Sequence, residues 1–518
     1  MLTRPSAIPK GLPKDITSIC PECGKLIPGR LRDENGKVVM EKSCEDHGSF
    51  SDVVWSDTEL YLKAESWAKD GIGVENPAIK DAKTCPFDCG LCNLHLSHTA
   101  LANVDLTNRC NLKCPICFAN ANAAGYVFEP DFDTVVKMLQ MLRDERPVPT
   151  PAVQFSGGEP TIHPKFVEII KKASEMGFSQ VQVATNGVRF ANEPEFIEAS
   201  RKAGLNTIYL QFDGLREDIY IAARGKPLLE VKKRAIENIR KTPDHPSIVL
   251  VPTVVKGIND DQVWPIVKFA MQNMDIIRGI NFQPVAFAGR ISQEERQSQR
   301  YTISDLVLEI ERQSKGAIRR TDWYPPPAVA VISDLAGMLM GKKYVTFTTH
   351  PNCGLATYLF INKETGEITP IPKFIKVDNI FKEMQRLTEK AEKRRFRFIT
   401  KIQVLMLLRR NIDKKNLPKG LSRTKFLRTL GSLFSDKTKK SLAKFSWDML
   451  YIGSMHFQDS YNYDIDRVMR CSIHYTTPDG RIIPFCAYNS GPVYRTEIEK
   501  KFSMPLDKWR KEKGAEYT

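Results

Sequence analysis

Apolar residues along the middle of the chain follow two alternating patterns. Short apolar runs, typical of buried strands, are separated by longer segments whose apolar positions recur every three or four residues, as in helices that face a core. The predicted strands span 101–107, 152–155, 180–184, 207–212, 248–255 and 279–284. The predicted helices lie between them, at 131–145, 164–176, 193–203, 228–240 and 261–271. Six strands alternating with five helices indicate an α/β fold with a parallel sheet, and right-handed crossovers curl such a sheet into a partial (β/α)6 barrel.

Polar motifs follow the carboxyl ends of these strands. In chain order they are Cys110-Asn-Leu-Lys-Cys114-Pro-Ile-Cys117, Ser156-Gly-Gly-Glu-Pro160, Thr185-Asn-Gly187 and Gln211-Phe-Asp213. The carboxyl ends of barrel strands meet at one face, so these motifs are expected to form one site. Three thiolates spaced CxxxCxxC can hold three irons of a [4Fe–4S] cluster and leave the fourth iron open. A structural zinc loop is the alternative, although zinc sites are usually built from separated pairs that total four ligands.

The order of these motifs resembles that of the radical S-adenosylmethionine (SAM) enzymes. The resemblance implies that Cys110, Cys114 and Cys117 bind the catalytic cluster and that the amino and carboxylate groups of SAM chelate its open iron. It implies cofactor contacts from Ile116, Phe118, Gly157, Gly158, Glu159, Thr185, Asn186, Gln211, Asp213, Val254 and Gln283.

Parts of SAM are assigned to different members of this set. The glycine-rich turn with Glu159 would receive the methionine ammonium, because glycines let the backbone approach closely. The ribose hydroxyls are assigned to Asn186, Gln211 and Asp213, and the adenine to Val254, Val255 and Gln283. One departure from the family pattern is Ile116, where an aromatic residue is usual; Phe118 follows the third cysteine instead.

The 12 cysteines are grouped in a way that suits metal binding. The chain opens without an apolar leader segment, so we expect an intracellular protein, in which disulfides are rare. The first group, Cys20, Cys23, Cys44 and His47, supplies four ligands in a CxxC…CxxH arrangement. It predicts a mononuclear site for zinc, or for iron in a rubredoxin-like setting. Such a site serves as a structural staple or as an electron relay, and the sequence leaves both open.

Two further cysteine groups predict one or two auxiliary [4Fe–4S] clusters. Cys85, Cys89 and Cys92 lie within a few residues and resemble a second cluster loop, with His95 or His98 as a possible fourth ligand. The last group is dispersed and consists of Cys353, Cys471 and Cys486. A hairpin turn at 478–480 would bring the last two opposite one another. The alternative for this last group is three unrelated buried cysteines.

The motifs divide the chain into four predicted parts. Residues 1–75 form the mononuclear metal lobe, 76–100 an auxiliary cluster loop, 101–300 the barrel, and 301–518 a C-terminal auxiliary-cluster domain. Within the last part, residues 391–445 carry 17 Lys or Arg against 3 acidic residues, in a chain whose net charge is +15. Because apolar positions recur among these charges, the segment predicts basic amphipathic helices, which bind anionic membrane surfaces or phosphates. The alternative is a solvated charged cover.

Nearly the whole chain resembles the archaeal tetraether lipid synthases. The resemblance rests on CPECGK…CxxHG, CPxDCGLC, CNLKCPICFA, MHFQD and CxIHxxxPDGRxxPFCxYN. It implies an enzyme that uses 5′-deoxyadenosyl radicals to join two isoprenoid chains of archaeal diether phospholipids at terminal methyl carbons. Such an enzyme would be cytoplasmic, peripheral to the membrane, reduced by a protein such as ferredoxin, and without a nucleic-acid partner. One alternative is a radical SAM methylase of a methanogen pterin. Another is a basic zinc protein that binds nucleic acid, although aromatic stacking motifs interleaved with the charge are missing.

Overall fold

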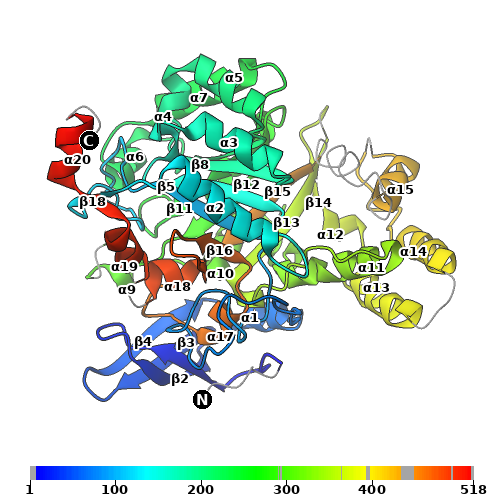
Figure 1. Cartoon of the computed structure of the whole chain (residues 1–518). Helices are drawn as coiled ribbons and strands as arrows, with labels where there is room; N and C mark the ends of the chain where they lie inside the picture. The colour runs from blue at the N-terminus through cyan, green and yellow to red at the C-terminus, as the bar shows by residue number, and fades with distance from the viewer. Residues whose placement is uncertain are drawn as a thin grey trace.

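The computed structural model describes residues 7–289, 291, 294–362, 364–392, 397–419, 421–432, 449–491 and 494–514. Figure 1 shows three parts. An α/β barrel, in cyan and green, lies at the centre, with an antiparallel sheet from the N-terminus (blue) below it. Helices from the later part of the chain (yellow and orange) project to one side. The largest cluster of buried apolar side chains lies between the barrel strands and their helices.

The barrel contains all the strands and helices predicted for it. Its strands are β5 (Leu101–Thr107), β7 (Ala152–Gly157), β8 (Gln180–Thr185), β9 (Thr207–Gln211), β10 (Ser247–Val251) and β12 (Ile277–Pro284), each parallel to its neighbour. The predicted helices are α2 (Phe132–Asp144), α3 (Phe166–Glu175), α5 (Pro194–Ala203), α7 (Leu229–Lys241) and α8 (Val263–Gln272). Two short helices were not predicted, α4 (Val188–Asn192) and α6 (Glu217–Arg224). The predicted strand 248–255 is divided into β10 and β11 (Thr253–Val254) at Pro252, which has no N–H to donate. The α/β partial barrel is confirmed.

The C-terminal part of the chain adds strands to both edges of the barrel sheet. β15 (Met449–Met455) pairs in parallel with β12, and β16 (Ile473–Thr476) pairs in parallel with β5. Antiparallel strands then extend the sheet: β13 (Gly354–Ile361), β14 (Ile368–Pro370) and β17 (Ile482–Pro484). The hairpin predicted around 478–480 is present as β16–β17, and β13–β14 forms a second hairpin. Of the described strands after residue 301, all but β18 therefore belong to the barrel sheet.

The N-terminal sheet is an antiparallel meander of β1 (Lys14–Ile19), β2 (Leu26–Glu34), β3 (Lys37–Cys44) and β4 (Gly48–Trp55), followed by α1 (Thr58–Glu65). Buried polar contacts join it to the C-terminal part. Lys42 Nζ donates to the Ser460 carbonyl at 2.6 Å. Arg300 donates from one terminal nitrogen to Asp52 and from the other to Asp459, both at 2.6 Å. Because these groups are buried, each contact is costly to break, so the metal lobe is fixed against the C-terminal part.

The projecting helices are α11 (Ala330–Met340), α13 (Val377–Glu392), α14 (Arg397–Arg410) and α15 (Arg423–Ser432). The described part of the basic segment 391–445 begins at the end of α13 and includes α14 and α15. α14 buries Val404, Leu407 and Leu408 against its neighbours and exposes Ile402 and Leu405. Residues 393–396, 420 and 433–445 of the predicted basic segment lie outside the described residues. Within the part of the chain that is described, no helix has both the length and the apolar character to cross a bilayer.

The remaining elements cover the edges of these parts. They are β6 (Tyr126–Phe128), α9 (Arg296–Gln299), α10 (Ile303–Gln313), α12 (Ile371–Phe374), α17 (Ile465–Met469), α18 (Phe485–Ser490), α19 (Tyr494–Lys501), β18 (Ser503–Pro505) and α20 (Leu506–Lys513). β18 pairs with β6, which brings residues 503–505 beside the segment that follows the cysteine motif.

Candidate functional site

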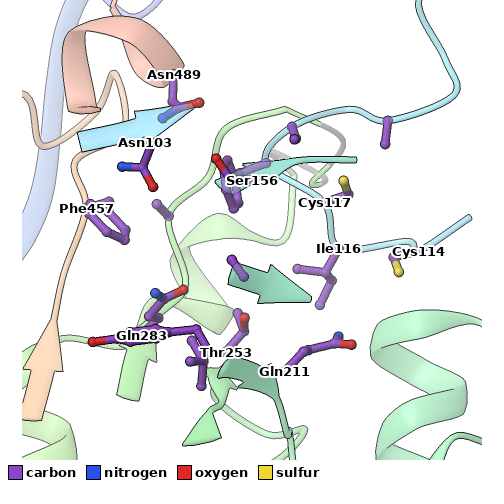
Figure 2. A pocket seen from close by; sticks show the side chains of 18 of the residues that line it. Asn103, Cys114, Ile116, Cys117, Ser156, Gln211, Thr253, Gln283, Phe457 and Asn489 are labelled. Atoms are coloured by element: carbon purple, nitrogen blue, oxygen red, sulfur yellow. The ribbon is translucent and has the colours of Figure 1, made fainter. Parts of the chain in front are cut away.

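A cavity of about 290 Å³ opens at the carboxyl ends of the barrel strands. Its wall includes Cys110, Cys114 and Cys117, which are the only cysteines among the described residues that line it. Figure 2 shows Cys114 and Cys117 on one side and Asn103 and Phe457 on the other. The cavity is therefore bounded by the cysteine loop at one end and by the C-terminal part of the chain at the other.

Most residues predicted to contact SAM line this cavity. They are Ile116, Phe118, Gly157, Gly158, Glu159, Thr185, Asn186, Gln211 and Gln283. Asp213 and Val254 do not line it. Val254 is fully buried in the hydrophobic core, and its neighbours Val251 and Thr253 face the cavity instead. Side chains alternate between the two faces of a strand, so Val251 and Thr253 point to the face opposite to that of Val254. The sequence assignment had expected Val254 to point toward the cavity.

The two glycines at the end of β7, Gly157 and Gly158, allow the backbone to pack against the strand end that leads into the cysteine loop. A Cβ on Gly157, whose φ is +127°, would lie 2.2 Å from the Thr107 carbonyl oxygen. A Cβ on Gly158 would lie equally close to the Arg109 carbonyl oxygen. The Gly158 N–H donates to Thr107 and the Glu159 N–H to Arg109, at 2.7 and 2.9 Å. The glycines therefore fix the position at which the loop to Cys110 begins.

The carboxylate of Glu159 joins two of the motifs. One oxygen accepts hydrogen bonds from the Thr161 and Thr185 hydroxyls at 2.6 and 2.8 Å, and the other accepts one from the Asn186 N–H at 2.8 Å. Burial raises the pKa of Glu159 above its usual value, while these hydrogen bonds oppose the shift. Glu159 thus positions the turn that carries Asn186. Its assignment as the partner of an ammonium group stays a prediction.

The carboxylate of Asp213 is held by the protein itself. The Arg224 guanidinium donates to both of its oxygens at 2.8 Å, and the Thr253 N–H donates at 3.1 Å. Arg224 also donates to the Ile116 carbonyl oxygen at 3.0 Å. The sequence assigned this carboxylate to the ribose hydroxyls of SAM. In the structure it points toward Arg224 instead, because a buried carboxylate is stabilised by a guanidinium that donates to both of its oxygens. The pair supports the loop between the second and third cysteines.

Lys232, on α7, is a further residue that the sequence did not identify. Its side chain is fully buried, and its Nζ donates to the Asn186 carbonyl and, at 2.9 Å, to Gln211 Oε1. Burial lowers its pKa to about 8. It fixes two residues predicted to contact the ribose. No periodic signal distinguishes it from the other lysines of that helix.

The chemistry of the cysteine loop fits a cluster with three protein ligands. Burial raises the pKa values of the Cys110 and Cys114 thiols, so both are neutral until a metal displaces the proton. The Leu112 N–H donates to Cys110 Sγ at 3.4 Å, and hydrogen bonds of this kind stabilise a ligating thiolate. Among the described residues no fourth cysteine lines the cavity, and the hydrogen-bonding groups of its wall, such as Asn186 and Gln211, suit a bound cofactor.

The N-terminal cysteine group forms a mononuclear metal site. Its four ligand atoms all lie within 4.8 Å of one another. His47 Nδ1 is 3.7 Å from Cys20 Sγ and 3.6 Å from Cys44 Sγ, and Cys23 Sγ is 3.9 Å from Cys44 Sγ. A tetrahedral zinc with Zn–S bonds of about 2.3 Å places its sulfur ligands about 3.8 Å apart. The geometry fits one ion and is too tight for a four-iron cube.

We expect Cys44→Ser to release one metal ion per chain and to lower the melting temperature of the N-terminal sheet. Cys44 ends β3, so its loss removes a ligand that joins two loops of this sheet. Metal analysis and circular dichroism measure the effect. Formation of 5′-deoxyadenosine from SAM should survive, because the ligands of the barrel loop are separate. A loss of four irons would show that the site holds a cluster.

The second and third cysteine groups lie together. Cys85, Cys89 and Cys92 are buried in one packed cluster with Cys471 and Cys486. The Nε2 of His95 lies 2.8 Å from the Cys471 carbonyl oxygen, and the Nε2 of His98 accepts a hydrogen bond from the Thr346 N–H at 3.0 Å. The Nε2 atoms of both candidate fourth ligands are therefore engaged elsewhere, whereas His98 Nδ1 is buried without a hydrogen-bond partner among the described residues.

Cys353 adjoins the same cluster through Arg467, whose Nε donates to Cys353 Sγ at 3.4 Å. The Gln458 N–H donates to Cys486 Sγ at 3.4 Å, and burial raises the pKa of Cys486 to about 11. Within the described residues, the side-chain donors Gln458 Nε2 and Asn462 Nδ2 are buried without a hydrogen-bond partner. Unpaired buried donors are expected where a protein binds a further polar group. Auxiliary clusters at these cysteines stay a prediction that this arrangement supports.

Two families match parts of the chain. Residues 104–270 match the radical SAM superfamily, and residues 12–56 match the HMPTM N-terminal zinc ribbon domain. The first range contains the three cysteines of the barrel loop, and the second contains the mononuclear site. The [4Fe–4S] cluster, SAM and an additional metal are therefore the cofactors of this chain, in agreement with the ligand sets described above.

Similar proteins extend these matches. The chain is 45% identical to the 7,8-dihydro-6-hydroxymethylpterin dimethyltransferase of Methanocaldococcus jannaschii, over 96% of this chain and 97% of that protein. A probable GTP 3′,8-cyclase of Thermococcus kodakarensis is 26% identical over 35% of this chain and 56% of its own length. Among solved structures, Streptococcus suis SuiB bound to SAM is 18% identical with a TM-score of 0.34, over 43% of this chain and 48% of that one. The chain belongs to the radical SAM superfamily and, within it, to the family of the M. jannaschii 7,8-dihydro-6-hydroxymethylpterin dimethyltransferase.

Proposed function

We propose that this protein is a radical SAM methyltransferase whose substrate is a reduced pterin, 7,8-dihydro-6-hydroxymethylpterin. The observation that carries the proposal is the 45% identity to the protein of that name, which extends over nearly the whole of both chains. The N-terminal sheet also matches the HMPTM zinc ribbon domain, which supports the proposal. The pterin methylase, stated above as an alternative, is therefore the favoured hypothesis.

The expectation of a tetraether lipid synthase is wrong. A relative that matches over 96% of this chain is a pterin methyltransferase, so archaeal diether phospholipids are dropped as substrate and the membrane surface as partner. The cysteine motifs misled because they determine where iron is bound, and enzymes with different substrates need the same iron chemistry. The basic segment then takes its plainer interpretation, a solvated charged cover on the projecting helices.

When bound, the cluster and SAM supply a 5′-deoxyadenosyl radical that removes hydrogen from unactivated C–H bonds. The side chains of the site hold the cofactor and exclude water. Glu159 and Lys232 fix Asn186, and Lys232 also fixes Gln211. Arg224 fixes the backbone at Ile116, between the second and third cysteines. The apolar wall formed by Val251 and Ile116 keeps solvent away from a reactive carbon.

The proposal is tested by anaerobic incubation of the purified holoenzyme with SAM, a strong reductant, a one-carbon donor and the reduced pterin. Each added methyl group replaces one hydrogen atom, which leaves in 5′-deoxyadenosine. Mass spectrometry should find pterins that carry one and two additional methyl groups. Unchanged pterin, together with 5′-deoxyadenosine no more abundant than without pterin, would contradict the proposal.

A further inference from the structure

A row of polar side chains crosses the barrel sheet at one level. Asn103 on β5 is in register with Gln154 on β7, and Gln154 is in register with Gln182 on β8. On the other side of Asn103, Tyr475 on β16 occupies the same level. Side chains in register on neighbouring parallel strands point to the same face of the sheet. Asn103, Gln154 and Tyr475 line the cavity, so the row is part of its wall.

The hydrogen bonds along this row run in one direction. Gln182 Nε2 donates to Gln154 Oε1, and Gln154 Nε2 donates to Asn103 Oδ1, each at 2.8 Å. These bonds occupy the carbonyl oxygen of Asn103 and fix the plane of its amide, so its NH2 group stands at the end of the row. Asn103 is 1% exposed, and its Nδ2 has no hydrogen-bond partner among the described residues.

A buried donor without an acceptor is rare in native proteins, because burial removes water and supplies nothing in exchange. The NH2 groups of Gln182 and Gln154 are paired, because each donates to the amide oxygen of the next residue in the row. Asn489, a second asparagine in the same wall, donates to the Phe485 carbonyl at 3.0 Å and accepts from Arg495. Within the row of Asn103, Gln154 and Gln182, Asn103 is thus the member whose amide donor is left for a ligand.

The surroundings of Asn103 suit a flat ring. Phe457 lines the same end of the cavity and stacks on Phe485, with centroids 3.8 Å apart and planes 20° apart. Figure 2 shows Asn103, Phe457 and Asn489 on the side of the cavity away from Cys114 and Cys117. An aromatic face beside a fixed polar donor is the usual composition of a site for a planar heterocycle.

We propose that Asn103 is a specificity-determining residue whose Nδ2 donates a hydrogen bond to the acceptor edge of the pterin ring. The inference rests on the proposed function and names the part of the substrate that is read. In a dihydropterin, the ring oxygen and the neighbouring imine nitrogen point in the same direction, as O6 and N7 do in guanine. An amide donor held by Gln154 and Gln182 is complementary to such an edge. Binding of SAM, at the opposite end, does not use Asn103.

Two substitutions test this role. Asn103→Asp keeps the shape of the side chain and the oxygen that accepts from Gln154, but replaces the free donor by an acceptor. Asn103→Leu removes the donor without adding charge and covers the case in which a buried carboxylate prevents folding. Equilibrium dialysis of the reduced pterin against anaerobic holoenzyme should show affinity reduced about 10- to 100-fold in each, as expected for loss of one buried hydrogen bond to substrate. Affinity for SAM and cleavage of SAM without pterin should be unchanged.

Asn192→Asp is the matched control, since it makes the same chemical change at an exposed residue that does not line the cavity and keeps the oxygen that accepts from Arg234. It should bind the pterin as the parent does. If the Asn103 variants bind the pterin normally while the parent methylates it, the role of Asn103 is refuted and the proposed function stands. If the variants lose SAM and not pterin, Asn103 belongs to the cofactor site and the inference is wrong. If the parent neither binds nor methylates the pterin, both proposals fail.

Discussion

Replacement of Cys110, Cys114 and Cys117 together by Ala should abolish the formation of 5′-deoxyadenosine. These residues are the only cysteines among the described residues that line the barrel cavity, so no neighbouring thiol can take their place. The variant should also lose about four irons per chain, one cluster's worth. Iron and sulfide analysis, together with quantification of 5′-deoxyadenosine by mass spectrometry, measures both effects.

The matched control is the triple replacement of Cys85, Cys89 and Cys92 by Ala. These thiols lie in a different packed cluster, so the variant should lose other irons and keep those of the barrel loop. The two triple variants should therefore lose different sets of iron. Cleavage of SAM by the Cys110, Cys114 and Cys117 variant would show that the catalytic cluster is bound elsewhere.

Arg224→Met should destabilise the protein by about 3–5 kcal/mol, because it leaves the Asp213 carboxylate as an uncompensated buried charge. Both members of the pair are almost inaccessible, with side-chain exposures of 8% and 0%. The substitution also removes the hydrogen bond to the Ile116 carbonyl, so the cysteine loop should lose iron more readily. Anaerobic urea denaturation and the rate of iron release to a chelator are the measurements.

The double variant Asp213→Asn with Arg224→Met separates the two effects. It removes the buried charge, so most of the lost stability should return. Rapid iron release should persist, because the Ile116 carbonyl still has no donor. If the double variant releases iron as slowly as the parent, the guanidinium does not support the loop.

The sequence was sufficient for the barrel because local signals define it. The predicted strand 101–107 coincides with β5, where Ala102, Val104 and Leu106 alternate with polar residues and the cysteine motif follows. The turn chemistry of the paired glycines likewise places the second motif beside the first. Strands β15 and β16 were missed as barrel strands, because they pair with partners more than 150 residues earlier and such pairing leaves no local trace.

Contacts between side chains that are distant in the sequence could not be predicted from it either. Asp213 was assigned to the cofactor because it ends a strand beside Gln211, yet Arg224 from an unpredicted helix binds it. The wrong expectation of a lipid substrate has the same cause, since it rested on local motifs. Motifs with fixed spacing disclose metal ligands, whereas Asn103, Gln154 and Gln182 come together only through strand register. Whole-chain similarity to a pterin methyltransferase was needed to overturn the expectation of a lipid substrate.

The most direct test of the account follows hydrogen from substrate to cofactor. The holoenzyme is incubated anaerobically with SAM, a reductant and 7,8-dihydro-6-hydroxymethylpterin that carries deuterium on its carbon atoms, and 5′-deoxyadenosine is analysed by mass spectrometry. The account predicts deuterium in 5′-deoxyadenosine, and none when Cys110, Cys114 and Cys117 are replaced. Unlabelled 5′-deoxyadenosine from an enzyme that cleaves SAM actively would show that the radical does not act on the pterin, and would contradict the proposed function.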